Sequence, residues 1–354
     1  MPGVSDSHWS AQDTTPDAID AALRKMLFER HTENAAYVPA RALNLICVVD
    51  KEWSGEIANR LRQVGRYHAS RTVVLEVEDK RTSIDAVATI ASDVRPEPGS
   101  FALLRETVVV DIGQKHIDGL VPLVDPLVVT DLPTVVWAPH GHTQAVEALL
   151  SLAQVVLLDS VDEPDMRDGI NRAMALLRDA YVVDLAWLRS TPWRERVAAT
   201  FDPPHLRPDL RTISAVTVRH HPESAVAGVL LMGWLASRLD WRLSPLMARD
   251  GTLVGSAHAR RQDVRLTLEP ANDLMVRGLA GVTLETASGR HFDLDRGPGG
   301  LQAYYRNAKG QERRWVVLGA SRGEAGILGE GIRQALLRDP TYSPALEKAR
   351  EFAK

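Results

Sequence analysis

The sequence predicts two domains of different fold class: an N-terminal doubly wound α/β domain with a parallel sheet, and a C-terminal α+β domain with a mainly antiparallel sheet and flanking helices. In the first half, apolar runs alternate with helical patterns, as in βαβ units. In the second half, short alternating segments are separated by polar turns, as in antiparallel sheets. The chain has 354 residues, which exceeds the roughly 100–200 residues of one ordinary domain.

We expect an N-terminal arm with a helix over residues 1–40, the α/β domain over 41–205 and the α+β domain over 206–354. Residues 1–15 are polar and predicted to be loose. The next segment, Pro16–His31, has apolar residues at helical spacing. Thr15 is its predicted N-cap and Pro16 its first helical residue.

The strands predicted in the α/β domain are nearly continuous apolar runs, because parallel strands are buried on both faces. These strands are Leu45–Val49, Arg71–Val77, Thr107–Ile112, Pro133–Trp137 and Val155–Asp159. The helices between and after them are Trp53–Val64, His116–Val129, Gln144–Ala153 and Asp165–Tyr181. Pro122 and Pro126 limit the second of these helices to short pieces.

A bridging segment, Leu185–Pro204, forms the end of the predicted α/β domain. Within it Thr191 and Pro192 mark a helix start, and the Pro203–Pro204 pair marks its end. The predicted elements of the second domain come next. These are strands Ile213–Val218, Trp241–Leu246, Asp263–Leu268, Leu274–Glu285, Arg290–Leu294 and Ala303–Arg306, with helices Ala225–Leu239, Glu324–Leu337 and Pro344–Phe352.

Charge is divided unevenly along the chain. Residues 1–205 carry a net charge of −10 and residues 206–354 a net charge of +6, which gives the overall −4. The basic residues of the second half are spread along predicted strands, not gathered into one stripe, so we expect no nucleic-acid binding. No signal peptide or membrane-spanning run is predicted, and the single cysteine, Cys47, excludes an internal disulfide. We expect a cytoplasmic protein that does not bind membranes.

The sequence contains no cofactor fingerprint. The first predicted strand is followed by Asp50-Lys51-Glu52-Trp53-Ser54-Gly55, where a dinucleotide site would need several glycines. A glycine-rich turn at residues 319–326 matches neither common phosphate-loop spacing. We therefore interpret this turn as a hinge before the last helices and not as a phosphate site.

No metal site or catalytic set is predicted either. His140 and His142, and the pair at 220–221, lack the further ligands that a stable metal site needs. Asp50, Asp111 and Asp159 stand near predicted strand ends, where α/β active sites gather, but strand-end aspartates also cap helices. Without a nucleophile motif or an exposed cysteine, we expect no catalytic residues, no cofactor and no metal.

Four segments, taken in order, resemble the OpcA family of glucose-6-phosphate dehydrogenase assembly proteins. They are Arg66–Arg71 (RYHASR), Thr130–Trp137 (TDLPTVVW), Val155–Ser160 (VVLLDS) and Asp184–Glu195 (DLAWLRSTPWRE), of which the last is the most specific. The similarity runs from about Ala42 to the end of the chain.

The resemblance implies a non-catalytic partner of glucose-6-phosphate dehydrogenase in the oxidative pentose phosphate pathway. Such a protein would favour the active oligomer of the dehydrogenase as an allosteric activator, and so support NADPH production. Tryptophan and arginine are favoured at interfaces, so candidate partner contacts lie in the family segments. They are Arg189, Trp193, Arg194, Ser70 and Arg71.

Two alternatives stay open. The candidate contacts could instead serve the fold, with Trp193 and Arg194 packing the bridging segment and Ser70 and Arg71 shaping a turn. The protein could also be a sugar-phosphate- or nucleotide-binding enzyme that uses the carboxyl ends of the α/β strands, near Asp50, Asp111 and Asp159.

Overall fold

The computed structural model describes residues 6–39, 41–64, 70–92, 100–260, 262–318 and 323–352. The chain forms two compact units. The first unit comprises Met1–Leu158, Asp179–Val183 and Glu324–Leu336, and the second comprises Asp159–Arg178, Asp184–Gly323 and Leu337–Lys354. The chain therefore passes between the units more than once, whereas the sequence predicted a single boundary at residue 205.

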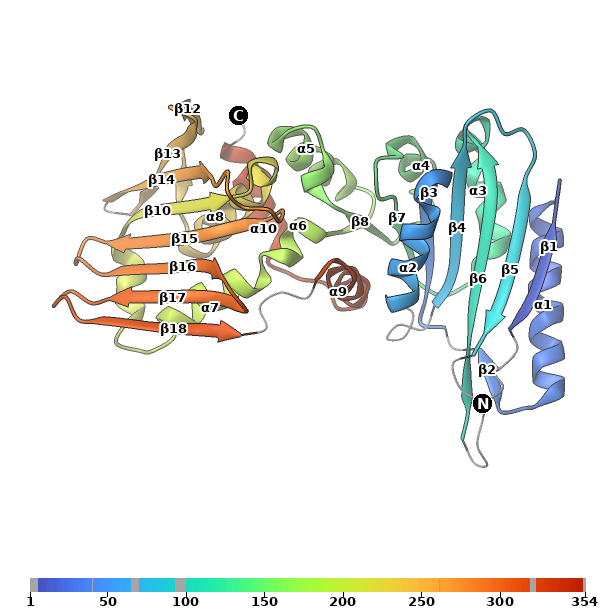
Figure 1. Ribbon diagram of the computed structural model, residues 1–354. Helices are drawn as coiled ribbons and strands as arrows, with labels where there is room; N and C mark the ends of the chain where they lie inside the picture. Colours follow the sequence, from blue (N-terminus) through green and yellow to red (C-terminus); the bar gives the residue numbers. More distant parts are fainter. Residues whose placement is uncertain are drawn as a thin grey trace. The chain divides into compact units, whose positions relative to one another are not determined.

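The first unit is built on a mixed sheet in the order β1-β5-β6-β4-β3-β7-β8-β9, with β2 paired to β6 (Figure 1). Strands β3, β4, β6, β7 and β8 pair in parallel. The order reverses at β3, as expected for a doubly wound sheet, so the predicted fold class is confirmed for this unit. The strands are β1 Ser7–Ala11, β2 Tyr37–Pro39, β3 Leu43–Asp50, β4 Ser70–Glu78, β5 Asp85–Ala91, β6 Ala102–Gly113, β7 Thr134–Trp137, β8 Val155–Leu158 and β9 Tyr181–Asp184.

The helices of the first unit follow the local signals of the sequence. They are α1 Pro16–Glu33, α2 Ser54–Val64, α3 Leu120–Val124, α4 Thr143–Leu149 and α9 Gly323–Leu337, with short 3-10 turns at Lys51–Trp53, Gln114–Gly119 and Asp125–Leu127. Thr15 caps α1, since its hydroxyl accepts a hydrogen bond from the Ala18 amide at 3.3 Å. Pro122 and Pro126 coincide with short helical pieces, as predicted.

The N-terminal arm is not loose throughout, so that prediction was wrong. Strand β1 pairs antiparallel with β5, which pairs antiparallel with β6. These two strands form the edge of the sheet next to the parallel strands. Neither is a continuous apolar run, since β1 has the sequence SHWSA and β5 the sequence DAVATIA, so they lack the pattern by which the parallel strands were predicted.

The second unit carries a sheet in the order β11-β13-β14-β10-β15-β16-β17-β18, with β12 paired to β13 (Figure 1). All neighbours are antiparallel except β10 and β14. The strands are β10 Ile213–His220, β11 Arg242–Leu243, β12 Met247–Arg249, β13 Thr252–Ala259, β14 Gln262–Pro270, β15 Leu279–Thr286, β16 His291–Gly297, β17 Gly300–Arg306 and β18 Glu312–Leu318. The predicted mainly antiparallel α+β class is confirmed here.

Helices pack on the sheet of the second unit and on each other. They are α5 Met166–Leu176, α6 Leu185–Arg189, α7 Thr191–Phe201, α8 Ala225–Leu239 and α10 Tyr342–Phe352, with 3-10 turns at Ser160–Asp162, Arg207–Thr212 and Pro222–Ser224. The largely buried α8 contacts β10, β14 and α10. Gly233 permits the close approach of α8 and α10, because a Cβ there would lie 2.3 Å from the carbonyl oxygen of Ala345.

Several elements differ from the sequence prediction. The strand predicted over Leu274–Glu285 begins at Leu279, that predicted over Trp241–Leu246 spans only Arg242–Leu243, and β13 and β18 were not predicted. The helix predicted over Asp165–Tyr181 ends at Leu176, and Tyr181 begins β9. Ser190, not Thr191, occupies the N-cap position of α7. Among the described helices, none is long and apolar enough to cross a membrane.

Candidate functional site

The carboxyl ends of the parallel strands in the first unit hold a charged cluster. Lys51 follows β3 and donates hydrogen bonds to Glu76 at the end of β4 and to Asp111 near the end of β6. Burial raises the pKa of Glu76, against the opposing effect of Lys51. Burial lowers the pKa of Lys51, but its bonds to the two carboxylates outweigh this effect and raise it. Lys51 therefore stays charged and compensates two acidic groups.

The loops beside this cluster contain no phosphate cradle. Trp53 lies where a glycine-rich turn would bring backbone close to a phosphate, and its ring centre is 5.3 Å from that of His140. Within the described part of the chain, no group of three or more histidine, cysteine, aspartate or glutamate side chains is placed to hold a metal ion. Cys47 is buried in β3, and burial raises the pKa of its thiol far above the normal range.

Each of the three strand-end aspartates has a cationic or imidazole neighbour. Asp111 binds Lys51, and Asp50 Oδ1 lies 3.1 Å from the Nε2 atom of His142. In the second unit, Asp159 accepts two hydrogen bonds from the guanidinium of Arg189, at 2.9 and 2.6 Å. These contacts give the carboxylates structural partners. Asp50 and Asp159 occupy N-cap positions but make no side-chain capping hydrogen bond, so the helix-capping role proposed for them is not what the structure shows.

The most specific family segment, Asp184–Glu195, forms a buried hydrogen-bonded cluster in the second unit. Asp184 caps α6 by accepting from the Ala186 amide at 2.9 Å, and it also accepts from the Ser160 amide at 3.2 Å and the Tyr342 hydroxyl at 3.1 Å. The indole Nε1 of Trp187 donates to Asp339 at 2.8 Å. The segment thus connects α6 to the start of α10 and to the turn after Asp159.

Arg194 completes this cluster. Its guanidinium carbon lies 3.4 Å from the ring centre of Trp187, and its nitrogens donate to Ser190 Oγ at 3.1 Å and Thr191 Oγ1 at 2.9 Å. Burial lowers the pKa of Arg194 to about 10, which leaves it a cation at neutral pH. Trp193 beside it is 2% exposed.

Ser70 and Arg71, at the start of β4, also have partners within the first unit. Arg71 is buried and pairs with the buried carboxylate of Glu106, and it donates to the Leu127 carbonyl at 3.2 Å. Arg41 contacts the second oxygen of Glu106. Ser70 Oγ lies 3.2 Å from Thr72 Oγ1. Residues 66–69 of the same family segment, and the turn at 319–322, lie outside the described residues.

The five candidate contacts are divided between the two units. Arg189, Trp193 and Arg194 belong to the second unit, and Ser70 and Arg71 belong to the first. Their partner-binding role stays a prediction, while the contacts described here match the structural alternative.

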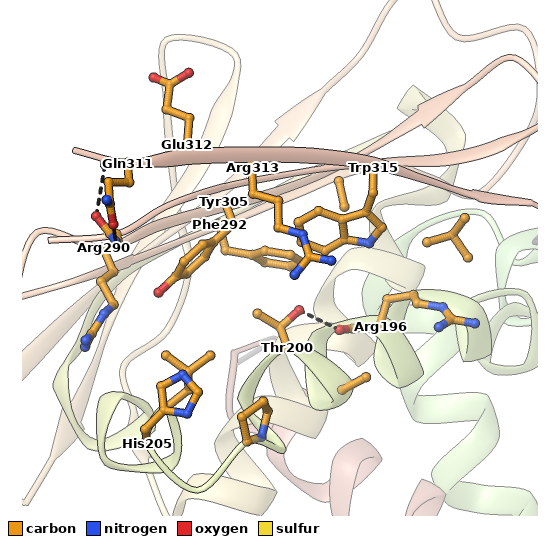
Figure 2. Close-up of a pocket in the computed structure, with 16 residues that line it drawn as sticks. Arg196, Thr200, His205, Arg290, Phe292, Tyr305, Gln311, Glu312, Arg313 and Trp315 are labelled. Atoms are coloured by element: carbon orange, nitrogen blue, oxygen red, sulfur yellow. Dashed lines mark hydrogen bonds between the residues drawn. The ribbon is translucent and has the colours of Figure 1, made fainter. Parts of the chain in front are cut away.

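One candidate region escaped the sequence analysis. An open cavity of about 640 Å³ in the second unit is lined by Arg196, His205, Arg313, Trp315 and other residues of α7, the turn after it and the sheet (Figure 2). The available signal was the run Glu312–Leu318, in which three charged residues are followed by four apolar residues.

Two family models match this chain in sequence order. Residues 62–175 match the N-terminal domain, and residues 180–346 the C-terminal domain, of an OpcA family described as a glucose-6-phosphate dehydrogenase subunit. The chain belongs to the OpcA family. Because these models cover most of it, the resemblance found in the four sequence segments is confirmed.

Curated relatives carry the same family name. A protein of Synechocystis sp. named as an OxPP cycle protein OpcA is 29% identical over 34% of this chain, and one of Synechococcus elongatus is 28% identical over 39%. The aligned regions span only 26% and 32% of those two relatives. This OpcA chain therefore matches about a third or less of their length.

Solved structures with a similar course of the chain share little sequence with this OpcA protein. The apo scyllo-inositol dehydrogenase of Lactobacillus casei is 11% identical, with a TM-score of 0.47 over 89% of this chain and 96% of its own. The dehydrogenase MviM of Clostridium difficile is 9% identical, with a TM-score of 0.47 over 86% and 96%. Likeness at this level carries no argument about activity.

Proposed function

We propose that this OpcA protein is a non-catalytic assembly factor that binds glucose-6-phosphate dehydrogenase and favours its active oligomer as an allosteric activator. It would thereby support NADPH production in the oxidative pentose phosphate pathway. The observation that carries the proposal is the match of both family domains, in order, to domains described as a dehydrogenase subunit.

The strand ends of the first unit support the non-catalytic part of the proposal. In a dinucleotide-binding fold, the backbone after the first strand approaches a phosphate closely. Here that segment carries Asp50, Glu52 and Trp53, and the nearby Lys51 is engaged by Glu76 and Asp111. The two acidic residues would repel a phosphate, and the tryptophan would obstruct it.

An assembly factor shifts its partner only by binding one state more tightly than another. Binding restricted to the active oligomer would also raise the apparent stability of that oligomer by mass action. The proposal therefore requires that the affinity for the assembled dehydrogenase exceed the affinity for its separate subunits.

A direct test mixes the purified full-length chain with glucose-6-phosphate dehydrogenase from the same organism. Native mass and initial rate are measured over a range of glucose 6-phosphate concentrations, with serum albumin as the control. We expect a complex of defined mass and a higher rate or a lower KM. No complex and no kinetic change would reject the proposal.

A second candidate function follows from the position of Asp50, Asp111 and Lys51 at the strand ends. A sugar-phosphate- or nucleotide-binding enzyme would place its site there. A thermal-shift screen over phosphorylated sugars and nucleotides tests it, with Lys51→Met as the variant. A saturable shift that Lys51→Met abolishes, together with turnover of the ligand, would favour this candidate over the first.

The five candidate contacts enter the proposal as positioning residues. Arg189 and Arg194 hold Asp159 and Trp187, and Arg71 holds Glu106, so their replacement would act on a partner through the fold. Trp193 is buried in the second unit, and Ser70 is partly buried. Partner binding should be measured only for variants whose folded state is retained.

A further inference from the structure

The cavity of the second unit lies between helix α7 with its following turn and one face of strands β16 to β18. Ala199 and Thr200 of α7 form one side, and Phe292, Ala303 and Trp315 of the strands form the other. Its volume of about 640 Å³ falls within the range of about 300–1,000 Å³ that is usual for small-molecule sites. All lining residues belong to the second unit.

Three uncompensated cationic or potentially cationic side chains line the cavity. In the described part of the chain, no acidic side chain pairs with Arg196, His205 or Arg313. Arg290 also lines the cavity, but it is paired with the buried Asp209. Figure 2 shows Arg313 reaching from its strand toward Thr200. Glu312 also lines the cavity, but its carboxylate lies 3.9 Å from a guanidinium nitrogen of Arg314, on the other face of the sheet. The cavity thus carries an excess of positive charge.

The cavity walls between these charges are largely apolar and aromatic. Phe292, Tyr305 and Trp315 place their rings along the sheet side (Figure 2). The guanidinium carbon of Arg313 lies 5.4 Å from the ring centre of Trp315. A planar ligand group can stack against such rings, as nucleic-acid bases do on aromatic side chains.

Some of the neutral polar groups of the cavity already hydrogen-bond to other protein groups. The Thr200 hydroxyl donates to the Arg196 carbonyl at 2.9 Å, and the Asn307 amide donates to Gln311 at 2.8 Å. A bare sugar phosphate would leave the aromatic wall of Phe292, Tyr305 and Trp315 uncovered. A planar base joined to an anionic group fits the aromatic walls and the arginines better.

We propose that this cavity binds a mononucleotide, with its base against Tyr305 and Trp315 and its phosphate held by Arg313 and Arg196. Guanidinium groups bind phosphate through charge-assisted, often bidentate hydrogen bonds. The site would make this protein responsive to a nucleotide metabolite. This property goes beyond the proposed assembly role, which does not require it. It also lies apart in sequence from the strand ends that a dinucleotide fold would use.

Binding of three probes to the purified full-length chain tests the proposal. Isothermal titration calorimetry is run with AMP, with adenosine and with ribose 5-phosphate. We expect saturable binding of AMP and at least about tenfold weaker binding of the other two, because each lacks one of the two recognised parts. Equal binding of ribose 5-phosphate and AMP would overturn the nucleotide assignment, and so would no AMP binding at millimolar concentration.

Neighbouring arginines on β18 provide a matched control. Arg313 faces the cavity, whereas Arg314 lies over the ring of Tyr304, a neighbour on the opposite face of the sheet. Arg313→Gln should weaken AMP binding about tenfold or more, and Arg314→Gln, which removes the same charge, should leave it within about twofold. Equal effects of the two variants would indicate a general charge effect and overturn the site.

A conservative aromatic change separates stacking from folding. Trp315→Phe keeps a ring and Trp315→Leu removes it, so AMP affinity should fall more for leucine, while far-ultraviolet circular dichroism stays native for both. An equal affinity for both variants and the native chain would contradict the stacking role. Because these measurements use no dehydrogenase, failure of the nucleotide site leaves the assembly proposal to its own test.

Discussion

The guanidinium of Arg194 stacks on the indole ring of Trp187, with 3.4 Å between the guanidinium carbon and the ring centre. Trp187 in turn donates its Nε1 hydrogen to Asp339. Hydrogen bonds from Thr341 and Trp187 lower the pKa of Asp339 even though its burial acts in the opposite direction. A segment conspicuous in the sequence for tryptophan and arginine is therefore a buried connection between α6, α7 and the start of α10.

Arg194→Ala should destabilise the protein by about 2 kcal/mol, because it removes a desolvated cation–π contact and several hydrogen bonds. Chemical denaturation measures the free energy of unfolding. Arg196→Ala, two residues along the same helix and exposed, is the control and should stay within about 0.5 kcal/mol. An unchanged stability of Arg194→Ala, combined with lost partner binding, would instead assign Arg194 to an interface.

Asp184 should make the stability depend on pH. Burial, followed by repulsion from Asp159, raises its pKa to about 6 in the folded state, against about 4 when unfolded. The folded protein then binds more protons between these values, so this group lowers stability as pH rises from about 4 to about 6. Its contribution is about 3 kcal/mol at most.

Asp184→Asn tests this dependence. The amide is neutral, retains an oxygen for the Ser160 and Ala186 amides and can donate to the Tyr342 oxygen. The free energy of unfolding is measured at pH 4 and pH 7 for both proteins. Between pH 4 and pH 7, we expect the free energy of unfolding of the variant to fall less, or to rise more, than that of the native protein. An equal change in the free energy of unfolding for both proteins would contradict the assignment of this pH dependence to Asp184.

Lys51→Met should destabilise the first unit, because Glu76 and Asp111 would lose their shared cation. The expected loss is about 1–2 kcal/mol, measured by thermal and chemical unfolding. Adding Glu76→Gln to Lys51→Met removes the remaining buried charge and should restore part of the stability. If the double variant loses more stability than the two single variants lose together, this explanation is contradicted.

Gly233→Ala should destabilise the second unit by about 1–3 kcal/mol, because its Cβ would fall 2.3 Å from the Ala345 carbonyl oxygen. Gly329→Ala is the matched control. It lies in helix α9 with nothing within 4 Å of an added Cβ, so it should be neutral or stabilising by up to about 1 kcal/mol. Equal effects would show that α8 and α10 can separate without cost.

The uneven charge of the chain leads to a prediction about its complex. If the −10 of residues 1–205 or the +6 of residues 206–354 steers the association, raising the salt concentration should slow complex formation with glucose-6-phosphate dehydrogenase. Association rates at low and high sodium chloride measure this effect. Rates that do not change with salt would exclude charge steering.

The strands buried on both faces could be read directly from sequence. Leu43–Asp50 and Thr134–Trp137 consist largely of apolar residues, and only the middle of a covered sheet tolerates such runs. Helix α1 could also be predicted from the sequence, because Thr15 and Pro16 are strong signals for a helix start. The antiparallel strands Ser7–Ala11 and Asp85–Ala91 were missed. They pair with each other across more than 70 residues, and Asp85–Ala91 also pairs with β6.

The roles of the candidate site residues were beyond what local sequence could settle. Tryptophan and arginine residues such as Trp193 and Arg194 can anchor an interface or pack inside a fold. Only their exposure to solvent in the structure distinguishes the two roles. Conversely, Arg196 and Arg313 looked like ordinary solvated residues. They reach one cavity only because α7 packs against the face of β18 that carries Arg313 and Trp315.

The amino-acid sequence by itself determined the family of this protein, the two fold classes and the lack of a glycine-rich cofactor loop after the first predicted strand, because motif order, apolar periodicity and glycine spacing are local properties. Only the tertiary structure decided which charges are buried and paired and which line a cavity. Arg194 stacks inside the fold and Arg313 stays without an acidic partner among the described residues, and that difference arises from contacts between segments far apart in the chain.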